Sequence, residues 1–228
     1  MKRKQSVFSI VIFLLFSGGY LFAQTAASEN FSGSLDHSGA YGQWEVDGGR
    51  LYQKDTEEHL AKINFKAPQK GIMEYRFDVR YEGGGIEDRM GGFGVHLFVD
   101  SAFAGKSWGN GESCLLWLNY DEDPIYGSAG LQAQVYKSTK HFEMELLEDY
   151  ETELPVRYLD TSYMDTVIPV KIQVDCSDGK VKVYDPTQSG RYFQFYLDEV
   201  PKEGNYFSFR TNNLSLSFDN LLIQRVHD

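Results

Sequence analysis

Apolar and polar residues alternate with a period of two along most of this chain. In residues 72–81 the odd positions from Met73 to Tyr81 are apolar or aromatic, and charged residues stand between them. This alternation is typical of a β-strand with one buried face. The same pattern recurs at 61–66, 93–99, 131–135, 168–176, 181–183, 193–197, 207–209 and 214–218. No long stretch has the 3.6-residue period of an amphipathic helix, so we expect an all-β chain of about a dozen short strands.

Turn-forming residues separate several of these segments. Asp47-Gly48-Gly49, Ser177-Asp178-Gly179 and the segment 202–205 have the composition of hairpin turns. Longer irregular segments are expected at 81–92, 101–112, 121–130 and 149–166. Many short antiparallel strands in one unit need two sheets that cover each other. The sequence therefore predicts a two-sheet antiparallel jelly-roll sandwich.

The first 23 residues have the pattern of a secretory signal peptide. Three basic residues at 2–4 precede an apolar run at 7–16, and a short segment ending in Ala23 follows. The apolar run is too short to span a bilayer, which takes about 20 residues. We therefore expect cleavage after Ala23, a single domain at 24–228 without a transmembrane anchor, and a periplasmic or secreted location.

Composition narrows the range of partners. The chain has 228 residues, of which 42% are hydrophobic, and 33 acidic residues outnumber 22 basic ones to give a net charge of -11. Such a surface repels nucleic acids and excludes them as the expected partner. The two cysteines, Cys114 and Cys176, both fall on the apolar side of predicted strands. Export permits a disulfide between them, and two separately buried thiols are an equally good interpretation.

Five segments follow one another in an order that is familiar from one group of sandwiches. They are the hairpin at 44–52, the strand at 73–81, the Gly-Phe-Gly-Val-His-Leu strand at 92–97, the hairpin at 178–179 and the closing pair at 207–223. In this order the chain resembles concanavalin A-like lectin and glucanase domains, including laminin-G-like modules. The resemblance spans the mature chain and implies a jelly roll, but that fold hosts enzymes, lectins and structural proteins alike.

One segment carries three carboxylates at short spacing, Glu143, Glu145 and Glu148. It resembles the Glu-x-Asp-x-x-Glu strand of retaining laminarinase-type glycoside hydrolases. The resemblance implies that Glu143 is the nucleophile, Glu145 the supporting acid and Glu148 the acid/base. However, Glu145 stands where the family has Asp, and further acids continue to residue 153. A solvated acidic strand edge explains this run better, so the sequence leans against an enzyme.

Aromatic and amide side chains form a second candidate site. Trp108 and Asn110 lie in a Gly-rich segment, and Trp117, Asn119 and Tyr120 lie in a predicted strand. Flat aromatic rings beside amide groups can stack on sugars and bond to their hydroxyls. We therefore predict a sugar-binding site at these residues, with Trp108 the more exposed ring. The alternative for Trp117 is a place in the core.

Asp121 and Asp123 form the third candidate site. Together with Glu122 they stand at the end of a predicted strand and could offer oxygen ligands to Ca²⁺. They lack the spacing of a known calcium loop, and acids before a proline are also ordinary turn formers. No other cofactor is predicted.

Three functions from different classes fit these observations. The sequence favours an exported, non-catalytic jelly roll that acts as a structural or interaction component of the cell envelope. The ending Leu21-Phe-Ala-Gln24 resembles spirochaete signal peptides, which makes a sheath component of periplasmic flagellar filaments one version of this hypothesis. The alternatives are a carbohydrate-binding, lectin-like module and a retaining glycoside hydrolase. The expected partner is accordingly an envelope or filament protein, or a glycan.

Overall fold

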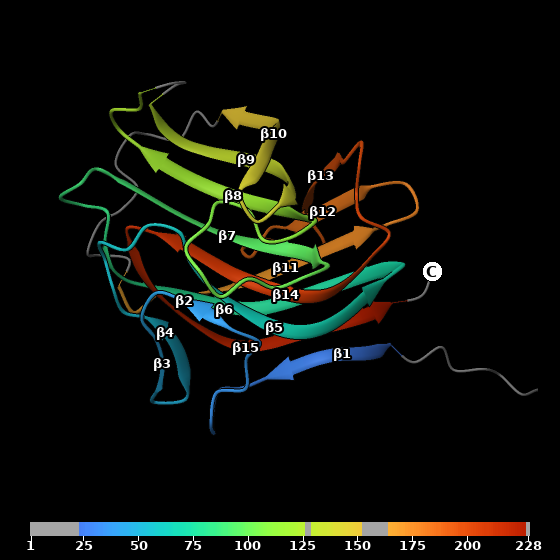
Figure 1. The fold of residues 1–228 in the computed structure, drawn as a ribbon, viewed down its shortest axis with the longest axis horizontal. Coiled ribbons are helices and arrows are strands. Elements are labelled where there is room, and N and C mark those ends of the chain that lie inside the picture. Colours follow the sequence, from blue (N-terminus) through green and yellow to red (C-terminus); the bar gives the residue numbers. More distant parts are fainter. Residues whose placement is uncertain (1–22, 126–128, 152–163, 227–228) are drawn as a thin grey trace, which may run out of the picture.

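The computed structural model describes residues 23–125, 129–151 and 164–226. These residues contain fifteen strands and no helix, and the strands form two antiparallel sheets that pack face to face (Figure 1). This confirms the predicted all-β sandwich. The predicted signal peptide lies almost entirely outside the described residues.

The first sheet, sheet A, has eight strands in the order β13-β12-β11-β6-β15-β4-β3, and β1 also pairs with β15. Its long central strands, β6 and β15, run side by side over most of their length. The bounds are β1 Gln24–Glu29, β3 Trp44–Asp47, β4 Arg50–Gln53, β6 Ile72–Gly84, β11 Val167–Asp175, β12 Lys180–Tyr184, β13 Tyr192–Tyr196 and β15 Leu214–Val226.

The second sheet, sheet B, has seven strands in the order β10-β9-β8-β7-β14-β5-β2. Its bounds are β2 Ala40–Tyr41, β5 Ala61–Lys70, β7 Met90–Val99, β8 Ser113–Asp121, β9 Gly130–Lys140, β10 Glu143–Glu151 and β14 Glu203–Asn212. One edge strand, β2, is short, and the other, β10, is acidic. Each of these features discourages pairing of the edge with another sheet.

Aromatic rings from both sheets form the centre of the core. Phe209 of sheet B stacks on Phe218 of sheet A with ring centroids 4.0 Å apart. Phe77 and Phe207 each lie with their centroids 5.0 Å from that of Phe209, edge to face. These residues come from the inward positions of strands that alternate as the sequence predicts. The period-two pattern therefore determines which side chains meet between the sheets.

Two of the three predicted turns are confirmed. Gly48 and Gly49 link β3 to β4 with φ of 54° and 79°, a left-handed conformation that glycine adopts without strain. Residues 177–179 likewise link β11 to β12. The turn predicted at 202–205 is wrong for its last three residues, because Glu203–Asn205 open β14. The segment predicted as irregular from 149 onward is also wrong at its start, since β10 continues to Glu151.

Both cysteines are free thiols buried in the core between the sheets. Burial raises the pKa of Cys114 to about 12 and that of Cys176 to about 11, so both thiols stay protonated at neutral pH. Of the two interpretations of the cysteine pattern, the structure contains the buried thiols and not the disulfide.

The buried thiols should be unreactive in the folded protein. Under native conditions, we expect that neither Cys114 nor Cys176 reacts with a thiol-reactive dye. In denaturant without a reductant, both cysteines should react. A denatured chain with no free thiol would show that the cysteines are bridged in the exported protein.

Removing the central ring of the core should destabilise the fold strongly. Phe209→Ala deletes a fully buried ring that contacts rings of both sheets, so it should lower the free energy of unfolding by about 3–5 kcal/mol. Urea denaturation followed by tryptophan fluorescence measures this change. Ile125→Ala, at a side chain that is 89% exposed, is the control and should change stability by less than about 0.5 kcal/mol.

Candidate functional site

The outer face of sheet B carries a line of polar and aromatic residues that crosses six strands. The strand registers place neighbours in this line directly opposite each other. In order from β5 to β10, the line consists of Lys62, Arg210, Gly94, Trp117, Gln134 and Asp149. Since successive side chains of a strand point to opposite faces, all of them point away from the core.

Trp117 lies flat against sheet B because β7 has glycines beneath it. A Cβ atom on Gly92 or Gly94 would overlap the indole ring. The Nε1 of Trp117 donates to Oδ1 of Asn119 at 3.4 Å, two residues along the same face. The ring is only 7% exposed. Trp117 therefore forms part of the surface of this face. The alternation in the sequence had predicted that Trp117 and Asn119 share one face of their strand.

The β7–β8 loop, residues 100–112, lies across the same face and covers its β5–β14 half (Figure 1). Its main anchor is Asn110, whose Nδ2 donates to Oδ1 of Asn64 and to Oγ of Ser208, both at 2.8 Å. Lys62 also holds the loop, since its Nζ donates to Oγ of Ser107 and, at 3.2 Å, to the Gly109 carbonyl. Lys62 and Asn64 of β5 and Ser208 and Arg210 of β14 are consequently buried under the loop.

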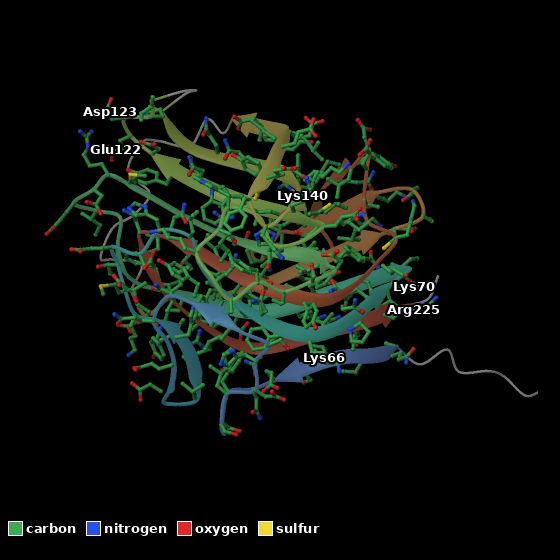
Figure 2. All side chains as sticks on the ribbon, in the orientation of Figure 1. Lys66, Lys70, Glu122, Asp123, Lys140 and Arg225 are labelled. Atoms are coloured by element: carbon green, nitrogen blue, oxygen red, sulfur yellow. The ribbon has the colours of Figure 1, made fainter. Side chains whose placement is uncertain are left out.

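The start of β10 covers the face from the opposite side. The register of β10 against β9 shifts between Leu146 and Glu148, and such a bulge bends a strand. Met144 thereby reaches back over the sheet, with its Sδ 3.8 Å from Nη1 of Arg210. The preceding turn is bonded to the loop, because Nδ1 of His141 accepts from Gly111 N at 2.9 Å. Lys140, labelled in Figure 2, marks where β9 leads into this turn.

Arg210 lies at the centre of the covered region. Its Nη1 donates to the carbonyl of Trp108. Its guanidinium carbon is 5.2 Å from the centroid of the Trp108 ring and 5.4 Å from that of Trp117. Cations attract aromatic faces at such distances. The Trp108 ring, by contrast, is 59% exposed, so it presents an accessible indole directly beside a buried cation.

Burial and mutual repulsion change the protonation of the basic groups on this face. Desolvation, and then the charge of Arg210, lower the pKa of Lys62 to about 7. Desolvation lowers the pKa of Arg210 to about 10, which leaves it charged at neutral pH. Desolvation, followed by Arg210 and Lys62, holds the pKa of His96 well below its usual range, so this imidazole is neutral.

The structure separates the five predicted sugar-binding residues. Trp108, Trp117 and Asn119 lie on the outer face of sheet B. Asn110 is fully buried, and its amide bonds to Asn64, Ser208 and the Phe103 N–H, so we assign it to anchoring the loop and not to a ligand. Tyr120 is 5% exposed and lies on the opposite face of β8, with its hydroxyl bonded to Glu122.

The alternation pattern gave a wrong expectation for the polar face of β5. Lys62 and Asn64 were expected at solvent-facing positions, yet both side chains are completely buried. Lys62 and Arg210 are therefore functional candidates that the sequence does not reveal. A regular strand pattern tells which residues share a face but not whether a distant loop covers that face.

The three predicted catalytic acids lie on β10, the exposed edge strand of sheet B. Glu143 accepts from Nζ of Lys140 at 3.2 Å and from Oγ1 of Thr139, and these bonds lower its pKa. In the register Glu145 lies opposite Lys137, and Glu148 lies opposite Val135. The acidic-edge interpretation fits this placement, and the glycoside-hydrolase alternative stays untested.

The proposed calcium ligands stand at the end of β8. Oδ1 of Asp121 accepts from the backbone N–H of Asp123 at 2.9 Å, which is the bond of an Asx turn. Glu122 and Asp123 lie together at this corner of the molecule (Figure 2). Across the described part of the chain, three or more metal-ligating side chains do not gather at any point. A calcium ion at this site therefore also stays a prediction.

Comparisons with known proteins place the fold. No protein-family model matches the chain, and no curated protein does. Among solved structures, a Bacillus subtilis protein of unknown function with a galectin-like fold has a TM-score of 0.56 and 15% identity, over 91% of this chain and 100% of that one. The CBM2 module of the evolved Dit protein of Lactobacillus casei BL23 phage J-1 has a TM-score of 0.55 and 10% identity, over 90% and 97%. A carbohydrate-binding module from Bacillus subtilis has a TM-score of 0.54 and 14% identity, over 83% and 98%.

These similarities establish the galectin-like, concanavalin A-like sandwich and, at such low identity, the fold alone. None of the three structures gives support to the filament-sheath hypothesis. Within the described ranges, no helix is long and apolar enough to cross a membrane.

The buried lysine should make stability depend on pH. The folded protein loses the Lys62 proton near pH 7, whereas the unfolded chain keeps it to about pH 10.4, so stability should rise with pH between these values. The free energy of unfolding of the native protein, minus that of Lys62→Met, should increase by about 1 kcal/mol per pH unit from pH 7 to 9.

Urea denaturation at several pH values measures this difference. Lys66→Met is the control for loss of one positive charge, because Lys66 is an exposed residue of the same strand, β5 (Figure 2). Parallel stability curves for the native protein and Lys62→Met would contradict the prediction.

Proposed function

We propose that this protein is an exported, lectin-like carbohydrate-binding module whose site is the outer face of sheet B. The observation that carries this proposal is the exposed Trp108 ring, which is held in place above the Arg210 guanidinium. The exposed indole offers a flat apolar face on which a sugar ring can stack.

Polar groups beside Trp117, on the same face of sheet B, can supply the hydrogen bonds that orient a sugar. Gln134 donates from Nε2 to Oε1 of Gln132 at 3.4 Å, and Tyr136 donates to Oε1 of Gln134 at 3.0 Å. Asn119 lies on the same face beside Trp117. Gln134 also donates from Nε2 to Oδ2 of Asp149 at 3.3 Å, so these groups form a bonded polar network that can exchange hydrogen bonds with ligand hydroxyl groups.

The comparisons support this function over a structural role in a filament sheath. One similar fold is described as a carbohydrate-binding module, and another as galectin-like. The acids on β10 lie on an exposed strand edge with Glu143 paired to Lys140, which gives no specific support to hydrolysis. In the proposal the chain acts outside the cytoplasm after removal of residues 1–23, and its partner is a glycan of the envelope or the surroundings.

Loss of the exposed indole should abolish glycan binding. Trp108→Ala should lower the affinity for any oligosaccharide bound by the native protein at least about tenfold, which corresponds to about 1.4 kcal/mol. A glycan array identifies the ligand, and titration calorimetry then measures the affinities.

Tyr196→Ala is the matched control for this experiment. It removes another exposed aromatic ring, 52% accessible, from sheet A and should leave the affinity unchanged. Equal affinities of Trp108→Ala and the native protein would place the glycan elsewhere, and absence of binding to every glycan would overturn the proposed function.

A further inference from the structure

Two basic side chains stand side by side on the outer face of sheet B. Arg210 of β14 lies directly opposite Lys62 of β5, and both are almost completely buried. His96 lies on the same face, opposite Ser208 in the next pair along β14. The ionisable groups on these strands of the face are therefore basic, in a chain whose net charge is -11. The acidic phenol of Tyr136 on β9 also lies near Arg210 and raises its pKa, against the larger lowering by desolvation.

No carboxylate balances this pair among the described residues. Arg210 and Lys62 take part in none of the ion pairs found there. The only charged group that affects the pKa of Lys62 is Arg210 itself. A buried charge without a counter-charge costs several kcal/mol. Natural proteins rarely carry that cost unless the charge has a function.

The hydrogen-bonding capacity of these basic groups is only partly used. The Nε of Arg210 and the Nε2 of His96 are buried without a hydrogen-bond partner. Arg210 donates to a neutral backbone carbonyl, that of Trp108, and to a thioether, that of Met144. The Trp108 carbonyl oxygen thus occupies a position where a negatively charged oxygen would bind more strongly.

We infer that Arg210, assisted by Lys62, anchors a carboxylate carried on the ring of an acidic sugar, with Trp108 as the stacking surface for that ring. This inference rests on the proposed glycan-binding function. A guanidinium suits a carboxylate because its planar N–H groups can form two parallel bonds. The carboxylate oxygen displaces the Trp108 carbonyl, which belongs to the β7–β8 loop, so binding moves this part of the loop.

The charge of the remaining surface makes this inference specific. Exposed acids on β10, including Glu145, Glu148 and Asp149, stand at the edge of the same sheet. They repel polyanions, so general electrostatic attraction does not explain a preference for an acidic ligand. Such a preference must arise at Arg210 and Lys62.

Matched acidic and neutral oligosaccharides test the inference. The native protein should bind trigalacturonate at least about tenfold more tightly than its fully methyl-esterified form in titration calorimetry. Arg210→Gln should reduce this ratio to near one. Sialyllactose against lactose is the second pair of probes and distinguishes a uronate from a sialic acid as the source of the carboxylate.

Lys182→Gln is the matched control, since it removes one positive charge from sheet A, where Lys182 lies 4.9 Å from the Tyr192 ring. It should keep the preference for the acid. Equal binding of acid and ester by the native protein, or a preference that survives Arg210→Gln, would overturn the inference and leave the proposed function standing. If the native protein binds none of the four probes and no other glycan, both the inference and the proposed function are overturned.

A measurement on the native protein alone covers the case in which Arg210→Gln does not fold. A bound carboxylate favours protonated Lys62, while Arg210 stays charged and His96 stays neutral near pH 7. Affinity for the acid should therefore fall about threefold or more between pH 6 and pH 8, and affinity for the ester should not change. A pH-independent affinity for the acid would remove Lys62 from the site.

Discussion

The carboxamide of Asn110 determines the shape of the outer face of sheet B. It bonds to Asn64 on β5 and Ser208 on β14, and so fixes the β7–β8 loop across two neighbouring strands. A buried amide left without these partners would cost about 1–3 kcal/mol. This anchorage, together with the bonds from Lys62 to the loop and from Gly111 to His141, sets the position of Trp108 and the burial of Arg210.

The anchored loop converts an ordinary polar sheet face into a site with unusual electrostatics. Under the loop, Lys62 and Arg210 lose their water and repel each other, which lowers the pKa of Lys62 to about 7. The same loop keeps the Trp108 ring accessible beside them. A buried cation and an exposed ring thus lie next to each other, so one ligand can contact both when the loop at Trp108 shifts. Stability is lower in exchange, as is common at functional sites.

Part of the candidate site could be predicted and part could not. The Gly-rich context of Trp108 correctly indicated an exposed ring, and the alternation of β8 placed Trp117 and Asn119 on one face. The amide of Asn110 bonds within the protein, so we assign it to anchoring the loop, and its expected role in sugar binding stays untested. Arg210 could not be found at all, since the groups it contacts, at Trp108 and Met144, are 102 and 66 residues away in the sequence.

The alternation of apolar and polar residues is enough to predict the sandwich and the two faces of each strand, because a period of two is a local property that burial of one face requires. The local sequence also predicts hairpins such as the one at Gly48-Gly49, where glycine is needed for a positive φ. The packing of the β7–β8 loop, by contrast, sets which polar face is covered, and hence that Lys62 and Arg210 are buried. That choice depends on contacts between segments far apart in the chain, and the covered residues have the same alternating pattern as those that face water.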